Sequence, residues 1–93
     1  MTHNIKVQQL TSPQSGAPVA NQFEIETPKG LYFQSYKSII ALKDNQGKIF
    51  LDSYYWDYSR TTSRYLNRFL NMTSKEVKLL IKEGIIKLTN LNK

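Results

Sequence analysis

Apolar and polar residues alternate through the first half of the chain, and this alternation predicts a β-sheet. Between residues 23 and 27, aromatic and β-branched positions alternate with Glu24 and Glu26. A period of two is typical of a strand with one buried face. Three more segments rich in aromatic and β-branched residues follow at 31–36, 38–42 and 49–52. Turn sequences containing proline or glycine separate them, which predicts an antiparallel β-meander of three to four strands.

After Trp56 the apolar spacing changes to that of a helix. Apolar residues recur at i, i+1, i+4 and i+5 and form one stripe: Tyr65, Leu66, Phe69 and Leu70. Asp57 or Ser59 can cap the start of this helix. These positions predict a first helix that packs by its apolar stripe.

A second helix is predicted from its capping residues. Thr73 followed by Glu76 has the spacing of a capping box, and Gly84 suits the position just after the C-terminus. The expected buried stripe consists of three residues: Val77, Leu80 and Ile81. The sequence IIKL at 85–88 then predicts a short C-terminal strand that returns to the sheet.

Together these elements predict an α+β fold with two helices packed on one face of the sheet. Residues 1–20 are polar and contain Pro13, Gly16 and Pro18, so a flexible N-terminal arm is expected there, with a single α+β domain over residues 21–93. A short edge strand around Val7 remains an alternative within the arm, because apolar and polar residues alternate there.

Charge is distributed unevenly along the 93 residues, whose net charge is +6. Residues 1–52 hold five lysines against four acids, and residues 53–93 hold eight basic residues against three acids. A basic excess of this kind favours a polyanionic partner, although many solvated faces have it too. The chain has no cysteine, which excludes disulfides and fits a reducing cytoplasm. Its N-terminus lacks the apolar stretch of a signal peptide, and no apolar run is long enough to span a bilayer, so no membrane association is expected.

Three arginines on the first predicted helix are candidates for partner contact. Arg60, Arg64 and Arg68 recur every four residues and therefore form one row that drifts slowly around the helix axis. Guanidinium groups offer forked donors for phosphate, and the neighbouring Tyr65 and Phe69 have rings on which a base can stack. The competing interpretation is a solvated face opposite the apolar stripe.

The densest aromatic segment lies just before this helix. It holds four large rings within five residues: Tyr54, Tyr55, Trp56 and Tyr58. Such residues can close a strand-to-helix corner, with their polar tips hydrogen-bonded. We expect Trp56 in the core, and Tyr54 or Tyr55 on the surface, depending on which points outward. The three tyrosines join the three arginines as candidate binding residues.

No residue pattern in the chain predicts catalysis. A glycine-rich phosphate loop and a nucleophile-elbow serine are both missing, and the single histidine, His3, lies in the expected arm. Glu24 and Glu26 share one face of a strand, but the sequence places no third ligand beside them. Neither an enzyme, a metal nor a cofactor is therefore expected.

Residues 19–92 also resemble a protein family, most specifically in YFQSY (32–36), WDYSRTT (56–62) and LTNLN (88–92). The family consists of small proteins of unknown function that are common in bacteriophages and mobile elements of low-GC bacteria. Its members often have Gly-Lys where this chain has Ser63-Arg64. The resemblance implies a phage or mobile-element origin and a location in the bacterial cytoplasm, and it transfers no catalytic residue.

These observations lead to a functional expectation with one alternative. We expect a non-enzymatic binding protein that modulates a host or anti-phage defence macromolecule, either a protein or a ribonucleoprotein; anti-CRISPR inhibitors are one such class. The basic charge argues against mimicry of DNA by an acidic surface. The alternative is a basic accessory protein that binds DNA or RNA directly.

Overall fold

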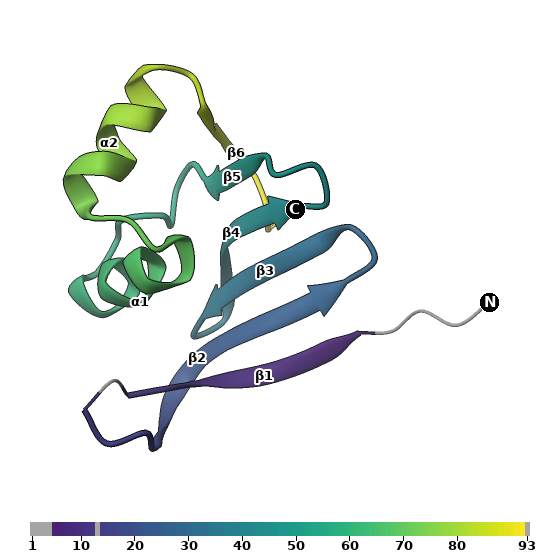
Figure 1. The fold of residues 1–93 in the computed structure, drawn as a ribbon, viewed down its shortest axis with the longest axis vertical. Helices are drawn as coiled ribbons and strands as arrows, with labels where there is room; N and C mark the ends of the chain where they lie inside the picture. The colour runs from purple at the N-terminus through teal and green to yellow at the C-terminus, as the bar shows by residue number, and fades with distance from the viewer. Residues whose placement is uncertain (1–4, 13, 93) are drawn as a thin grey trace.

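The structure, a computed structural model, describes residues 5–12 and 14–92. Its elements follow the chain in this order: β1 (Lys6–Thr11), β2 (Pro18–Thr27), β3 (Gly30–Ser35), β4 (Ser38–Asp44), β5 (Ile49–Asp52), α1 (Arg60–Leu70), α2 (Ser74–Lys82) and β6 (Ile86–Thr89). The strands form one sheet in sequence order. Both helices lie alongside the part of the sheet that consists of β3 to β6 (Figure 1). The predicted α+β class, with helices packed on one face, is confirmed, and the sheet has more strands than expected.

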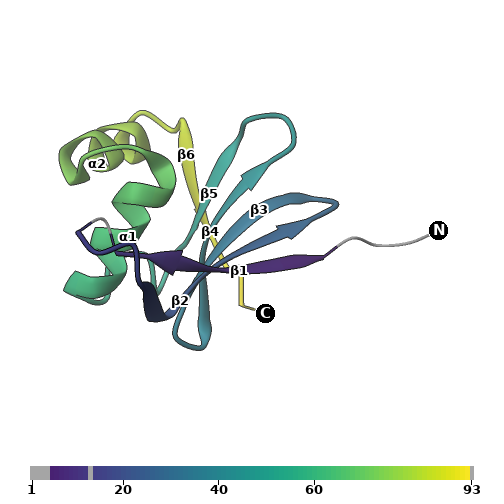
Figure 2. The same ribbon diagram turned by 60° about the horizontal axis from the view of Figure 1, so that its bottom comes forward.

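The direction of the last strand explains where the helices lie. β1 to β5 pair antiparallel, whereas β6 pairs parallel to β5. Parallel neighbours need a crossover connection rather than a tight turn. The chain therefore leaves the end of β5, forms α1 and α2, and returns beside β5 as β6, with the helices to one side of the sheet (Figure 2).

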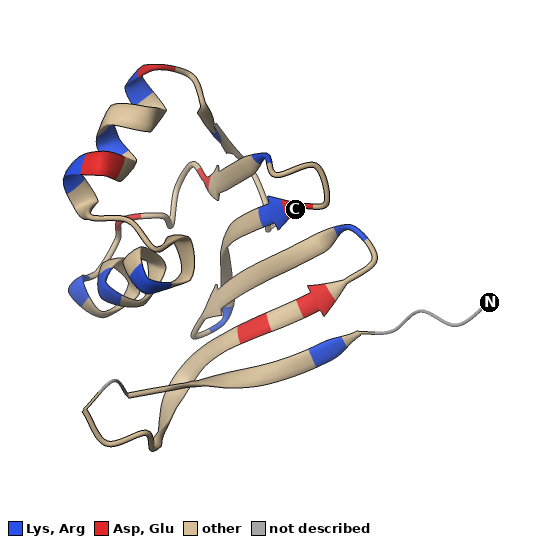
Figure 3. Cartoon of the chain, in the orientation of Figure 1, with Lys and Arg blue, Asp and Glu red and all other residues tan. Residues whose placement is uncertain are grey.

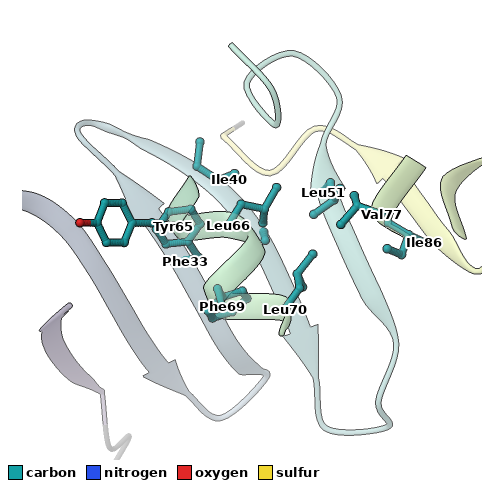
Figure 4. Close-up of a cluster of buried hydrophobic side chains, with 10 residues drawn as sticks. Phe33, Ile40, Leu51, Tyr65, Leu66, Phe69, Leu70, Val77 and Ile86 are labelled. Atoms are coloured by element: carbon teal, nitrogen blue, oxygen red, sulfur yellow. The ribbon is translucent and has the colours of Figure 1, made fainter. Parts of the chain in front are cut away.

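The hydrophobic core lies between the sheet and the two helices. Its buried members come from four strands and both helices: Phe33, Ile40, Ala41, Leu51, Tyr65, Leu66, Phe69, Leu70, Val77 and Ile86 (Figure 4). The rings of Phe33 and Phe69 stack with centroids 5.6 Å apart. All four residues of the predicted α1 stripe are buried here, and the predicted α2 stripe also packs on this core.

A close backbone approach fixes the turn between β2 and β3. Gly30 has a φ of 145° and lies opposite Asp44 in the sheet. A Cβ atom built at Gly30 would lie 2.3 Å from the carbonyl oxygen of Lys43. Only glycine fits both the backbone conformation and the space, which is why a glycine ends the TPKG turn.

The described part of residues 1–20 differs from the expected flexible arm. Lys6–Thr11 forms β1 and pairs with β2, which itself begins at Pro18, so the sheet starts well before Asn21. The segment has few apolar residues because β1 is an edge strand with most of its side chains exposed. Backbone hydrogen bonds hold such a strand without an apolar signature in the sequence. Leu10 and Val19 still pack on the core; His3 and Pro13 lie outside the described residues.

The helix ends agree with the capping residues found in the sequence. Ser59 is the N-cap of α1, and its Oγ accepts a hydrogen bond from the backbone N–H of Thr62. Thr73 and Glu76 form the reciprocal hydrogen bonds of a capping box at α2. Within the described residues, neither helix has the length and apolar character needed to cross a membrane.

Candidate binding surface at the first helix

A buried carboxylate builds the corner between β5 and α1. Asp52 is 2% exposed, and its Oδ2 accepts hydrogen bonds from the backbone N–H groups of Tyr54 (3.1 Å) and Tyr55 (2.9 Å). Its Oδ1 accepts from the N–H of Leu91 at 2.8 Å. Burial acts to raise the pKa of Asp52, but these hydrogen bonds and one from the Asn92 side chain outweigh it, so the pKa lies below its usual value.

The C-terminal segment is tied to the sheet beside this corner. The side-chain amide of Asn92 accepts from the N–H of Ile39 (2.7 Å) and donates to its carbonyl oxygen (2.8 Å). Pairing between β4 and β5 begins only at Ala41, so Asn92 replaces a strand neighbour for Ile39. The strand-to-helix corner therefore rests on residues far apart in the sequence.

The tyrosines that follow Asp52 form a chain of edge-to-face contacts. The ring centroids of Tyr54 and Tyr55 are 4.7 Å apart at 88°, and those of Tyr55 and Tyr58 are 5.5 Å apart at 77°. Tyr54 is 76% exposed and Tyr58 46% exposed, whereas Tyr55 is partly buried against the core. Trp56, expected in the core, is only partly buried at its border. The corner thus presents two exposed rings, Tyr54 and Tyr58, fixed by a third.

The arginine row divides into two parts. Arg60, Arg64 and Arg68 are all exposed on α1. Arg68 is engaged within the molecule: its Nη1 donates to the carbonyl oxygen of Thr11 in β1, and its guanidinium lies 6.0 Å from the ring centroid of Tyr65. We infer that Arg68 helps to hold the β1–β2 hairpin against α1. Arg60 and Arg64 are therefore the better candidates for partner contact.

Arg60 and Arg64 border a shallow surface depression of about 610 Å³. Its lining comes from the corner, from α1 and from the start of α2: Asp57, Tyr58, Ser59, Arg60, Ser63, Arg64, Asn67 and Ser74. One of the exposed tyrosines thus lines the same depression as Arg60 and Arg64. The structure brings Tyr58, Arg60 and Arg64 together, whereas Tyr54 lies at the far end of the tyrosine chain.

One family model matches residues 5–86, which is most of the chain. Its description is "Family of unknown function (DUF8033)". The chain belongs to this family. The match includes the β1 strand and every candidate binding residue. Neither a curated protein nor a solved structure matches the DUF8033 chain.

Several residues of the depression were not predicted from the sequence. Ser63, Asn67 and Ser74 are polar positions on two different helices, and Asn67 Nδ2 donates to Ser74 Oγ at 2.8 Å. No spacing rule links residues on separate helices, so only the packing of α1 against α2 shows that they are neighbours. Their short polar side chains carry no motif by which a site could be recognised.

The charges of the DUF8033 chain are distributed over the whole fold, with a basic excess on the two helices. Basic residues lie along α1 and α2, but α2 also holds the acidic Glu76, and lysines lie on the strands as well (Figure 3). Glu24 and Glu26 lie on β2. In the sheet, Glu26 pairs with Lys6 and Glu24 with Gln8, so the two carboxylates lie beside β1. Within the described residues, no group of three His, Cys, Asp or Glu side chains is placed to hold a metal ion.

Proposed function

We propose that this DUF8033 protein is a non-enzymatic binding protein of bacteriophage or mobile-element origin. It acts in the bacterial cytoplasm, where it modulates a host or anti-phage defence macromolecule, as an anti-CRISPR inhibitor does. One observation carries the proposal: Tyr58, Arg60 and Arg64 border the same open depression.

The residue types at this surface support recognition of a macromolecule. Tyrosine, tryptophan and arginine are the residues most enriched among the few that contribute most of the energy at protein interfaces. Tyr54 and Tyr58 are exposed but held by edge-to-face contacts through Tyr55, so they lose little conformational freedom on binding. Arg60 and Arg64 lie on a regular helix, which also limits the entropy lost when a partner is bound.

The positive charge of this surface indicates that the partner's contact surface is negatively charged. A surface with two arginines and few acids is complementary to an acidic protein surface or to the RNA of a ribonucleoprotein. Charge complementarity mainly accelerates association and excludes wrong partners. We therefore propose a partner that presents carboxylates or phosphates at the contact.

Affinity capture with matched variants tests the proposal. The tagged chain should retain one stoichiometric protein or ribonucleoprotein from a lysate of a bacterial host, and the double variant Arg60→Gln/Arg64→Gln should lose it. Lys37→Gln/Lys48→Gln is the control, because it removes the same charge from two exposed turn positions and should keep the partner. Equal retention by both double variants, or turnover of a small substrate by the protein, would contradict the proposal.

Direct binding to nucleic acid is the second candidate function, favoured by the basic residues of two adjacent helices. Exposed basic side chains continue from α1 onto α2: Arg60, Arg64, Arg68, Lys75, Lys78 and Lys82. Counterion release makes such binding steeply salt-dependent, with a log–log slope of about −0.9 per phosphate on duplex DNA. A gel-shift titration at several salt concentrations measures this slope. Absence of binding at about 50 mM salt, where phosphate contacts are strong, would remove the candidate.

A further inference from the structure

The depression beside Arg60 and Arg64 continues into a second, more enclosed hollow. This hollow has a volume of about 220 Å³ and shares four lining residues with the depression: Asp57, Ser63, Asn67 and Ser74. It adds Trp56 from the corner and Lys78 from α2. We call the two together the α1–α2 groove. The volume of the larger hollow, about 610 Å³, is that of a site for a small molecule or for one unit of a larger ligand.

The polar atoms of the α1–α2 groove suit an anion. Arg60, Arg64 and Lys78 outnumber the single carboxylate, Asp57. Ser74 Oγ accepts a hydrogen bond from Asn67, so its own hydroxyl proton remains able to donate. Guanidinium and hydroxyl donors converging on one hollow are the groups with which proteins bind phosphate oxygens.

Aromatic rings complete the α1–α2 groove. Tyr58 lines the open part and is 46% exposed, and Trp56 lines the enclosed part. The edge-to-face contact with Tyr55 holds the Tyr58 ring in place. A ring beside cations is the arrangement that binds unpaired bases, because the base stacks on the ring while the cations hold its phosphate.

We propose that the α1–α2 groove binds one phosphorylated nucleotide unit, with the phosphate between Arg60 and Arg64 and the base against Tyr58. The unit is either a free nucleotide or part of a single strand. A base pair in a duplex cannot present its face to the ring, so duplexes bind only through their phosphates. A phosphopeptide would use the arginines without needing Tyr58. This inference rests on the proposed function, because it identifies the chemistry of the partner's contact as that of nucleic acid.

Fluorescence anisotropy with a labelled single-stranded oligouridylate of about eight nucleotides tests the proposal, since single-strand sites span about 4–16 nucleotides. Arg60→Gln/Arg64→Gln should weaken binding and make the log–log salt slope shallower by about 0.7, the value for the one phosphate that both arginines contact. Tyr58→Ala should weaken it by about five- to 150-fold, the range for one stacked base, whereas Tyr58→Phe should bind as the unchanged protein does. Lys37→Gln/Lys48→Gln controls for net charge and should leave the salt slope nearly unchanged.

Competition experiments separate the sources of the nucleotide. If uridine monophosphate displaces the labelled strand, the ligand is a free nucleotide. If the unlabelled strand displaces it and uridine monophosphate does not, the ligand is a single-stranded segment. A duplex of equal length should compete poorly in both cases. Equal loss from the two double variants, no effect of Tyr58→Ala, or preferential displacement by a phosphoserine peptide would overturn the proposal. If the strand does not bind while Arg60→Gln/Arg64→Gln still loses its partner in affinity capture, this inference fails and the proposed function stands.

Discussion

Replacing Asp52 with asparagine should destabilise the protein by about 3.5–6 kcal/mol, because the carboxylate holds three backbone N–H groups from two separate segments. An asparagine side chain has nearly the same shape but only one acceptor oxygen. If that oxygen faces Tyr54 and Tyr55, the amide NH₂ group faces the N–H of Leu91, donor against donor. The substitution therefore removes one hydrogen bond to a charged group and weakens two.

The magnitude follows from the typical strength of such bonds. A hydrogen bond to a charged group contributes about 1.5–3 kcal/mol to stability, and a neutral one about 0.5–1.5 kcal/mol. Losing the bond to Leu91 and converting the other two from charged to neutral gives the estimate of about 3.5–6 kcal/mol. A domain of this size has a total stability of about 5–15 kcal/mol, so the loss would be a large fraction of it.

Chemical denaturation followed by circular dichroism measures this effect, and its pH dependence gives a second check. The folded-state pKa of Asp52 lies below its ordinary value of 3.8, so the carboxylate contributes stability that is full above the unfolded-state pKa. That contribution is lost as the pH falls through the lower folded-state pKa. The difference between the protein and Asp52→Asn should therefore be full at pH 7 and shrink below about pH 4.

An exposed acid in the same corner provides the control. Asp57→Asn removes the same charge from an exposed position, and we expect a change within about 0.5 kcal/mol. A destabilisation by Asp52→Asn of less than about 1 kcal/mol at pH 7 would refute the reasoning, since one charged bond alone exceeds that. A difference that stays constant down to pH 3 would show that the carboxylate charge has no part in holding the corner.

Two further stability predictions follow from burial. Trp56→Ala should destabilise the protein by about 1.5–3 kcal/mol, which is less than the 3–5 kcal/mol expected for a fully buried indole, because the ring is only partly buried. An unchanged denaturation midpoint would show that packing of Trp56 on the core does not stabilise the fold. The side-chain amide of Gln22 is fully buried and has no hydrogen-bond partner among the described residues. Gln22→Met should therefore raise the free energy of unfolding by about 1–3 kcal/mol. A lower denaturation midpoint would mean that the amide makes a hydrogen bond, for example to an internal water.

Local patterns predict the elements in the central part of this fold because propensity, turn residues and helix caps depend on near neighbours in the sequence. The alternation around residues 23–27 and the capping box at Thr73 depend only on near neighbours, and the predicted strand and helix both form. The face that β2 turns to the core is the opposite of the expected one, because Glu24 pairs with the buried Phe33 while Phe23 and Ile25 are only partly buried. β1 was expected only as an alternative within a flexible arm, because a mostly exposed edge strand has no buried face. The parallel pairing of β6 depends on the crossover through both helices, which no local pattern specifies.

The candidate site was predictable only for its largest and most charged residues. The four-residue spacing of the arginines identifies the exposed side of α1 but not that Arg68 donates to Thr11, a contact between segments 57 residues apart. Ser63 and Ser74 meet only because α1 packs against α2, so their common groove could not be found from the sequence. Long-range packing, not residue type, decides which polar residues share a site.

Buried hydroxyl groups at the start of α1 explain why its arginines can act as a fixed surface. Thr62 Oγ1 lies 2.8 Å from Ser35 Oγ of β3 and accepts a hydrogen bond from Ser59 Oγ at 3.0 Å. This short network joins the first turn of the helix to the sheet, one residue away from Arg60. A partner that binds Arg60 and Arg64 therefore meets a surface whose backbone is already in place, and little conformational entropy is lost on binding. Because residues 53–93 hold eight basic residues against three acids, an anionic partner is attracted to the part of the molecule in which these arginines lie.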